Sequence, residues 1–369
     1  MNRITISAII LLTLFAFKTE AQLKTLSGAQ ISTEKLDQFL AKQMDSLGIP
    51  GLSFALINNG KVVYHRAIGV SNMETKEKVN DQSIFEAASL SKTLFAYFVL
   101  KQVDQHKLDL DTPLYRYLPY PDIAKDERYK LITARMVLAH TSGFPNWRHS
   151  DQRDVSLYKY GELFLKFTPG TQFAYSGEGY YYLAQVIARL NKLTIITLDP
   201  LFQKEVSKPL KLKSAWFSGN KNITQHKVKG HMNGKPFDKA WPTSFPEQDS
   251  TWFEAAGGLH TEALNFSTFL IALMDGKGLS KNMINEMFKE QVQLDKNSPH
   301  FLYNGDTAWG LGIAIKPTKY GVIYEHGGNN GDFQSGFKIN KTNHNGYVLF
   351  SNCDQGRTLN TNIGNLLSQ

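Results

Sequence analysis

The sequence predicts an α/β fold: an antiparallel sheet flanked by helices and built from both chain ends, with a mostly helical inserted domain. Strand-like patterns occur near both ends of the chain, at residues 52–57, 62–67, 309–316, 322–326, 336–340 and 346–352. Between them, short helical patterns alternate with polar, proline-containing loops. We therefore expect the sheet from residues of about 33–104 and 255–369, and the helical insertion over about 105–254. A ligand site would lie in the crevice between them.

Helices are expected where apolar residues recur at helical spacing or form long runs. The first follows Ser32 or Thr33, either of which can cap it, and ends near Gly48. The segment Asn58-Asn59-Gly60 then joins the first two strands as a hairpin. A largely buried helix is expected from Phe85 to Leu100. Further helices are expected at residues 134–138, 180–190, 261–274 and 358–367.

The composition favours a folded chain with a substantial core. The 369 residues are 42% hydrophobic and carry a formal net charge of +8. Such a charge can draw a protein to anionic surfaces, but the chain has no run of five or six basic residues. We therefore interpret the charge as spread over the surface and expect no nucleic-acid partner. The single cysteine, Cys353, excludes an intramolecular disulfide and a zinc site built on cysteine pairs. We expect no metal and no other cofactor.

The N-terminus has the pattern of a secretory signal. Arg3 supplies a positive charge, residues 4–17 are apolar, and Ala21 offers a small residue for cleavage. The apolar stretch is shorter than the ~20 residues of a membrane span. We expect residues 1–21 to be a cleaved signal peptide, residues 22–369 to form the mature domain, and the protein to be secreted or periplasmic. An uncleaved signal anchor is the alternative.

A serine and a lysine one helical turn apart form the clearest candidate for catalysis. Ser89 and Lys92 lie on the same face of the expected helix. A neighbouring lysine can accept the serine proton if burial lowers its pKa. The same spacing recurs at Ser32, Ser156, Ser218 and Ser335. Ser89 differs from these because its surroundings are apolar, and an unpaired lysine there is costly.

Two further segments offer groups that complement the serine. Residues 169–177 form a turn that leads to Tyr175, which could shuttle a proton as a tyrosinate or through a lysine. Residues 325–329 place His326 beside Gly327 and Gly328, which would let a substrate backbone approach closely. His326 could bind a substrate carboxylate or support the proton network. The backbone N–H groups of Ser89 and Asn329 could form an oxyanion hole.

The order of these motifs resembles the serine β-lactamase-related superfamily. More narrowly, it resembles the branch of class C β-lactamases, D-alanyl-D-alanine carboxypeptidases and related esterases. The resemblance covers residues of about 33–355. It rests on Ser89-x-x-Lys92, the segment 140–143, the segment 169–176, the segment 256–259, and 326–328. It implies a β-lactamase/penicillin-binding-protein-like fold, with Ser89 as nucleophile, Lys92 as base and Tyr175 as proton shuttle. By residue chemistry alone, the segments 140–143 and 255–259 are structural loops.

Two departures from the family pattern bear on the substrate. Gly177 stands where the family has an asparagine that helps to hold the substrate amide and the lysine. Gly177, Gly327 and Gly328 are nonetheless our candidate substrate-binding residues. His326-Gly327-Gly328 replaces the Lys-Thr-Gly of true class C β-lactamases and looks like the peptidase and esterase members. Both differences argue against a specialised β-lactam-resistance enzyme.

The sequence therefore predicts an exported serine hydrolase that cleaves an amide or ester bond through an acyl-enzyme on Ser89. A D-amino-acid peptidase (D-alanyl-D-alanine carboxypeptidase-like) or esterase is expected, with a class C-like β-lactamase as the alternative. The substrate would be a small molecule or peptide, and cell-wall peptide is one candidate. An alternative of another class is a non-catalytic binding or scaffolding protein on the same fold.

Overall fold

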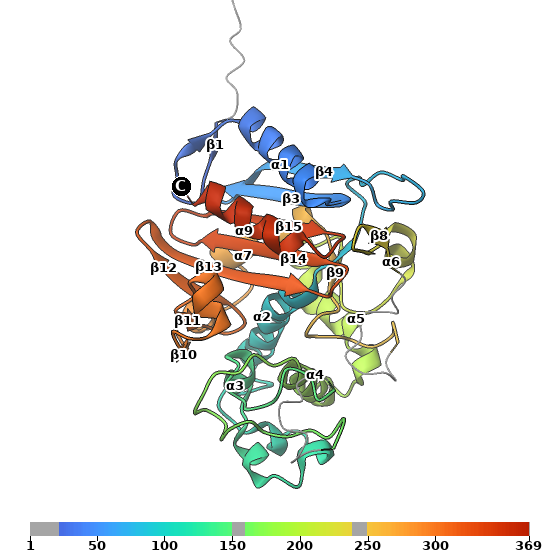
Figure 1. Ribbon diagram of the computed structural model, residues 1–369. Helices are drawn as coiled ribbons and strands as arrows, with labels where there is room; N and C mark the ends of the chain where they lie inside the picture. Colours follow the sequence, from blue (N-terminus) through green and yellow to red (C-terminus); the bar gives the residue numbers. More distant parts are fainter. Residues whose placement is uncertain (1–21, 150–158, 238–248, 369) are drawn as a thin grey trace, which may run out of the picture.

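An antiparallel sheet built from both ends of the chain forms the centre of the molecule (Figure 1). The computed structural model describes residues 22–149, 159–237 and 249–368. Within these residues, eight strands pair in the order β10-β11-β12-β13-β14-β15-β3-β4, and every neighbouring pair is antiparallel. The strands are β3 (Gly51–Asn58), β4 (Lys61–Gly69), β10 (Val292–Gln293), β11 (Ala308–Trp309), β12 (Ala314–Thr318), β13 (Gly321–Asn329), β14 (Gln334–Asn340) and β15 (Asn345–Ser351). The predicted fold class is confirmed.

Helices cover both faces of this sheet. Side chains of a strand alternate between the two faces. Leu52, Phe54 and Leu56 of β3 pack with the apolar side chains of α1 (Thr33–Leu47) and α9 (Gly356–Leu367). Ala55 and Ile57 belong to the second, larger core, which contains the buried face of α7 (Ala263–Met274). The sheet is therefore buried on both sides, which explains why β3 is apolar without alternation.

The expected start and hairpin of the N-terminal region are confirmed. Ser32, rather than Thr33, caps α1: its hydroxyl accepts a hydrogen bond from the Lys35 N–H at 3.2 Å. The helix ends at Gly48, which has a φ of +63°. Asn59 and Gly60 connect β3 to β4 with φ values of +50° and +71°. Two consecutive positive φ values fit a two-residue hairpin turn that twists with its strands.

Two expected elements are wrong in part. The helix predicted over residues 85–100 is three elements: a short strand, β5 (Phe85–Glu86), a 3₁₀ turn, η1 (Ala88–Leu90), and helix α2 (Ser91–Asp104). The strand predicted over residues 309–316 is interrupted by a turn between β11 and β12, in which Gly312 has a φ of +74° and the Gly310 N–H donates to the Ile313 carbonyl. In both places the apolar pattern reports burial, and it does not distinguish a strand from a helix or a turn.

Residues 105–237 contribute mainly helices, 3₁₀ turns and loops. In Figure 1, residues 134–138 and 178–190 lie below the sheet, whereas residues 221–236 lie beside it. The α-helices of this segment, within the described residues, are α3 (Ala134–Leu138), α4 (Glu178–Leu190), α5 (Asp199–Phe202) and α6 (Lys221–His226). The short strand β9 (His260–Thr261) pairs with β5 on one side and with β6 (Ala215–Trp216) on the other, and β7 (His231–Met232) pairs with β8 (Lys235–Pro236). Strand β1 (Leu23–Lys24) pairs with β2 (Gln30–Ile31) beside α1. The proposed limits of the helical insertion stay a prediction.

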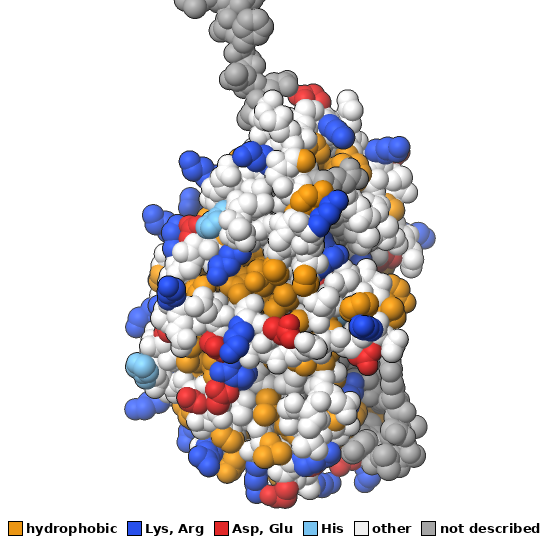
Figure 2. Space-filling view, turned by 90° about the vertical axis from the view of Figure 1, so that its left-hand side faces the viewer, with side chains coloured by type: hydrophobic (Ala, Val, Ile, Leu, Met, Phe, Trp, Pro, Cys, Tyr) orange, Lys and Arg blue, Asp and Glu red, His pale blue; other side chains and the backbone are white. Residues whose placement is uncertain are grey.

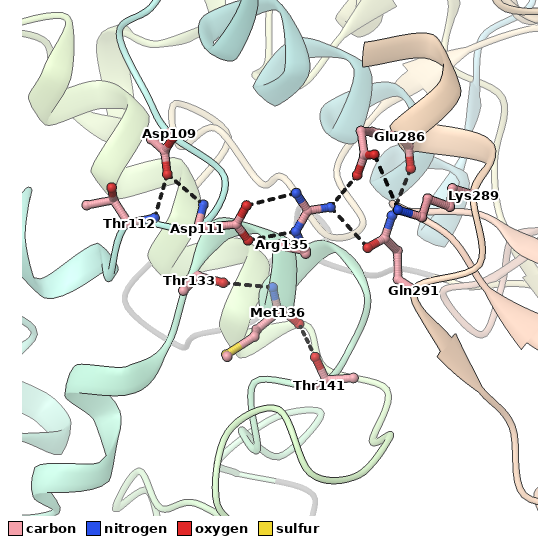
Figure 3. Close-up of polar contacts among 10 residues, drawn as sticks. All are labelled: Asp109, Asp111, Thr112, Thr133, Arg135, Met136, Thr141, Glu286, Lys289 and Gln291. Atoms are coloured by element: carbon pink, nitrogen blue, oxygen red, sulfur yellow. Dashed lines mark hydrogen bonds and ion pairs between the residues drawn. The ribbon is translucent and has the colours of Figure 1, made fainter. Parts of the chain in front are cut away.

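Arg135 of α3 ties the helical part to the rest of the molecule (Figure 3). Its guanidinium donates hydrogen bonds to both oxygens of Asp111, at 2.7 and 2.9 Å. The same guanidinium bonds Glu286 of α8 (Lys281–Phe288) and the Gln291 side chain, which precedes β10. These contacts link the helical part to α8 and to the segment that precedes β10.

On the face that Figure 2 shows, the surface agrees with the interpretation that the net charge is spread over the protein. Lys and Arg side chains are scattered there among acidic, neutral and hydrophobic ones, and no large basic patch forms. No helix among residues 22–149, 159–237 and 249–368 is both long and apolar enough to cross a membrane. The expected signal peptide, residues 1–21, lies outside the described residues.

Candidate active site

Ser89 sits on a strained turn between a strand and a helix. Ala88, the residue before it, has a φ of +47°, a conformation that non-glycine residues rarely adopt and that costs about 1–3 kcal/mol. The turn is held against the sheet by Ser335 of β14, whose hydroxyl donates to the Ala87 carbonyl at 2.7 Å. Ser89 lines the cleft and Lys92 follows in the first turn of α2. Strain beside a cleft-facing serine is typical of a functional site.

Lys92 is fully buried, and no carboxylate of the described residues lies within hydrogen-bonding distance of it. Its side chain is 1% exposed, and Nζ lies 3.3 Å from Ser89 Oγ and 2.8 Å from the Ala256 carbonyl oxygen. Burial lowers the pKa of Lys92 to about 7, although the nearby Glu254 carboxylate opposes this shift. At neutral pH, a large fraction of the lysine is therefore a free amine. One N–H can then donate to Ala256 while the lone pair faces Ser89.

Tyr175 lies beside both residues, within a cluster of aromatic rings. Lys92 Nζ is 4.8 Å from the centre of its ring, and its hydroxyl interacts with the Ser89 side chain. The His140 ring packs 4.3 Å away, centre to centre, and the Trp309 ring lies at 6.0 Å. Burial raises the pKa of Tyr175 well above its usual value. Tyr175 is therefore a neutral phenol at neutral pH and is not a resident tyrosinate.

His326 is buried, neutral and bonded to the backbone. Its Nδ1 lies 2.8 Å from the Gly327 carbonyl oxygen. Because a carbonyl only accepts, Nδ1 must carry the proton, and Nε2 is left as an acceptor. Burial lowers the pKa of His326 to about 3, with a further contribution from the Lys92 charge. A neutral imidazole attracts a carboxylate weakly, so the geometry favours a role in the proton network over carboxylate binding.

Strand β13 presents an open edge to Ser89. Its pairing with β12 ends at Glu325, so residues 326–329 have β14 on one side and the cleft on the other. Gly328 lets the Ser89 turn approach: a Cβ there would lie 2.2 Å from Ser335 Oγ and 2.6 Å from the Ala87 carbonyl oxygen. At Gly327 a Cβ would meet nothing within 4 Å. Asn329 ends the strand and lines the cleft.

These two glycines form a matched pair for mutation. Gly328→Ala is expected to push the Ser89 turn away from β13, because the Ala87 carbonyl and the Ser335 hydroxyl that bonds it occupy the space of the new methyl group. A displacement of about 1 Å can lower turnover about 100-fold, and overpacking costs about 1–3 kcal/mol. Gly327→Ala should leave the melting temperature unchanged. Thermal denaturation and ester turnover of both variants test this, and equal effects at the two positions would contradict the arrangement.

The predicted site residues converge on a single cleft, with one exception. The cleft has a volume of about 580 Å³, and its lining includes Ser89, Tyr175, His326, Gly327, Gly328 and Asn329. Lys92 lies directly behind Ser89. Gly177 is the exception, because it is not part of this lining. A Cβ at Gly177 would lie 2.1 Å from the Trp147 ring, so that ring occupies the space of a side chain. That Gly177 binds substrate therefore stays a prediction.

Sequence reasoning missed several residues that shape the site. Segments 140–143 and 255–259, expected to be structural loops, supply His140 and the Ala256 carbonyl that holds Lys92. His140 accepts the Ser176 N–H through Nδ1 at 3.1 Å, and burial lowers its pKa well below the usual value. A backbone carbonyl carries no signature in a sequence. The position of His140 beside Tyr175 depends on contacts across the fold.

No group of three or more His, Cys, Asp or Glu side chains in the described part of the chain is placed to hold a metal ion. The expected absence of a cofactor stays a prediction. Cys353 is buried, and burial raises the pKa of its thiol.

The fold and the Ser89–Lys92–Tyr175 arrangement define the class of protein as serine β-lactamase-related. The chain matches the family model described as Beta-lactamase over residues 36–367. It therefore belongs to the Beta-lactamase family, whose members are generally serine hydrolases.

Among curated relatives, Protein flp of Staphylococcus aureus strain MRSA252 is 26% identical over 228 residues, covering 58% of this chain and 45% of the relative. An N-acetylmuramyl-L-alanine amidase of Bacillus subtilis strain 168 is 28% identical over 218 residues, covering 52% and 48%. The chain thus matches about half the length of these relatives.

Two solved structures share the fold. The octameric penicillin-binding protein homologue from Pyrococcus abyssi superposes with a TM-score of 0.73 at 20% identity, covering 88% of this chain and 74% of that one. A crystal structure of SurE superposes with a TM-score of 0.71 at 21% identity, covering 91% and 75%. At such identities the likeness concerns the fold alone.

Proposed function

We propose that this protein is an exported serine hydrolase that cleaves an amide or ester bond through an acyl-enzyme on Ser89. The observation that carries the proposal is the buried amine of Lys92, 3.3 Å from Ser89 Oγ, with a pKa lowered to about 7. A nucleophilic serine needs a base whose pKa lies near the working pH. Export rests on the sequence pattern of residues 1–21.

Acylation starts with the neutral Lys92 amine. Nζ takes the Ser89 hydroxyl proton as Oγ attacks the substrate carbonyl carbon, and the carbonyl π electrons move onto oxygen. The N–H groups of Ser89 and Asn329 stabilise that oxyanion. The intermediate then collapses and expels an amine or alkoxide. That leaving group receives the Lys92 proton through the Tyr175 hydroxyl, which is a neutral relay because its pKa is raised.

Deacylation repeats these steps with water. A water molecule gives a proton to the same base and its oxygen attacks the acyl-enzyme carbonyl carbon. Ser89 Oγ leaves and is reprotonated, which restores the resting enzyme. Neutral His326, with Nε2 as an acceptor, supports the proton network in the cleft.

For the substrate we propose a D-amino-acid peptide or a related ester. Three cations line the cleft. Lys338 is paired with Glu325 and Lys316 bonds the Asn304 carbonyl, whereas Arg357 has no carboxylate partner among the described residues. Arg357 is suited to the terminal carboxylate of a peptide. The match to a curated N-acetylmuramyl-L-alanine amidase also supports cell-wall material as a substrate source.

A panel of three substrates tests the proposal: a peptide ending in D-alanyl-D-alanine, a p-nitrophenyl ester and a chromogenic cephalosporin. We expect turnover of the peptide or the ester and slow turnover of the β-lactam. If the peptide is cleaved, Arg357→Gln should raise its KM about 10-fold or more. The same variant should leave ester hydrolysis unchanged. Fast β-lactam turnover would favour the β-lactamase alternative, and no turnover of any substrate would favour a binding protein.

A further inference from the structure

A short segment, residues 254–259, holds the amine of Lys92 beside the turn that carries the nucleophile. The Ala256 carbonyl accepts a hydrogen bond from Lys92 Nζ at 2.8 Å. At the other end of the segment, the Leu259 carbonyl accepts from the N–H of Ala87, where that turn begins, also at 2.8 Å. The position of the amine therefore depends on the conformation of this segment.

Glu254 begins the segment, and its side chain folds back onto it. The residue is 2% exposed, and its Oε1 accepts a hydrogen bond from the Ala256 N–H at 2.9 Å. The Glu254 carbonyl accepts from the Gly258 N–H at 2.9 Å. A Cβ at Gly258 would lie 2.6 Å from the Glu254 Cβ, so the turn is closely packed around this side chain. The carboxylate thus holds the residue whose carbonyl bonds Lys92.

The same carboxylate also acts on Lys92 through its charge. Glu254 favours the protonated lysine and so opposes the effect of burial on the Lys92 pKa. Among the described residues, four other titratable side chains lie around the amine, and each is neutral near pH 7 because burial shifts its pKa away from that range: Tyr175, Tyr180, His140 and His326. Loss of the Glu254 charge would therefore leave Lys92 a weaker base, which is neutral down to a lower pH.

We propose that Glu254 is a positioning residue for Lys92: its carboxylate orients Ala256 and favours the protonated lysine, and it thereby sets the pH at which the free amine becomes available. This inference rests on the proposed function, in which Lys92 is the base. Two opposing effects then determine the working pH of the enzyme. Burial promotes the free amine, and the Glu254 charge keeps that amine basic enough to take the serine proton.

Glu254→Gln separates the two roles, because an amide oxygen can still accept from the Ala256 N–H but carries no charge. The readout is kcat/KM for a p-nitrophenyl ester as a function of pH. We expect the midpoint of its rise to move to lower pH by about 1, and the plateau to fall less than about 10-fold. Glu254→Ala also removes the acceptor. Its midpoint should move in the same direction, and its plateau should fall further, by about 100-fold.

Glu262→Gln is the matched control. Glu262 is also a buried carboxylate, 3% exposed, that accepts from nearby backbone N–H groups, those of Leu264 and Asn265. It is not among the charges that act on Lys92, so the midpoint in this variant should stay at the wild-type pH. If Glu254→Gln leaves the midpoint in place, or moves it to higher pH, Glu254 does not act on the base, and the inference is overturned while the proposed function stands.

Fluorophosphonate labelling of Ser89 over the same pH range distinguishes failure of the inference from failure of the proposed function. A folded wild-type protein that is neither labelled nor active on the ester would overturn both. A wild-type protein whose labelling rises with pH, together with an unshifted rise in Glu254→Gln, would overturn the inference alone. Melting temperatures identify loss of folding in Glu254→Ala, in which case Glu254→Gln decides.

Discussion

Ser89→Ala is expected to abolish ester hydrolysis, with kcat falling about 10⁴-fold or more. Removal of the nucleophile prevents formation of the acyl-enzyme, and the remaining groups cannot compensate because they act as a unit with it. The fold should persist, since Ser89 lies on the cleft and its neighbours Ala88 and Leu90 supply the buried contacts. Steady-state hydrolysis of a p-nitrophenyl ester measures the loss.

Ser32→Ala provides a matched control with the same Ser-x-x-Lys spacing. Ser32 caps α1 and is not part of the cleft lining, so its loss should cost about 1 kcal/mol of stability. Its effect on turnover should be negligible. Retained hydrolysis in Ser89→Ala, at a rate within about 10-fold of the wild-type protein, would contradict Ser89 as the nucleophile.

The second large effect concerns pH and Lys92. As the base, Lys92 must be neutral, so kcat/KM should rise as pH increases through about 7 and then level off. In Lys92→Met, kcat/KM should fall about 10³-fold or more, and it should no longer increase with pH through about 7. A profile that falls through pH 7, or one that Lys92→Met leaves intact, would assign the base to another group.

The same lysine links pH to stability. Its pKa is about 7 in the folded protein and near 10.5 in the unfolded chain, so the unfolded chain binds more protons between these values. The contribution of Lys92 to stability therefore increases as pH rises from about 7 to 10. The free energy of unfolding of the wild-type protein should rise relative to that of Lys92→Met over this window. Urea denaturation at several pH values measures the difference.

The sequence predicts the fold well because two signals agree. Strand patterns at both ends of the chain and the ordered motifs indicate the same sheet, and caps such as Ser32 and Gly48 fix local boundaries. The start of the helix at residues 85–100 is predicted wrongly. The apolar residues there form a strand and a strained turn before the helix begins. The φ of Ala88 in that turn depends on tertiary packing against β13 and β14.

Prediction of the site is less complete for the same reason. The sequence indicates Ser89, Lys92, Tyr175 and His326, because side chains of these types can act as nucleophiles, bases or proton carriers. It does not indicate the Ala256 carbonyl, which is backbone, nor the neutral state of His326, which follows from burial. Nor does it indicate that Trp147 covers Gly177, because these residues are 30 positions apart and meet only in the folded chain.

Intact-mass spectrometry after incubation with a fluorophosphonate tests the central claim most directly. We expect a single adduct on the protein, located at Ser89 by peptide mapping and absent from Ser89→Ala. The rate of labelling should rise with pH through about 7, following deprotonation of Lys92. A folded protein that forms no adduct, or an adduct that maps to another residue, would contradict the assignment of Ser89 as an activated nucleophile.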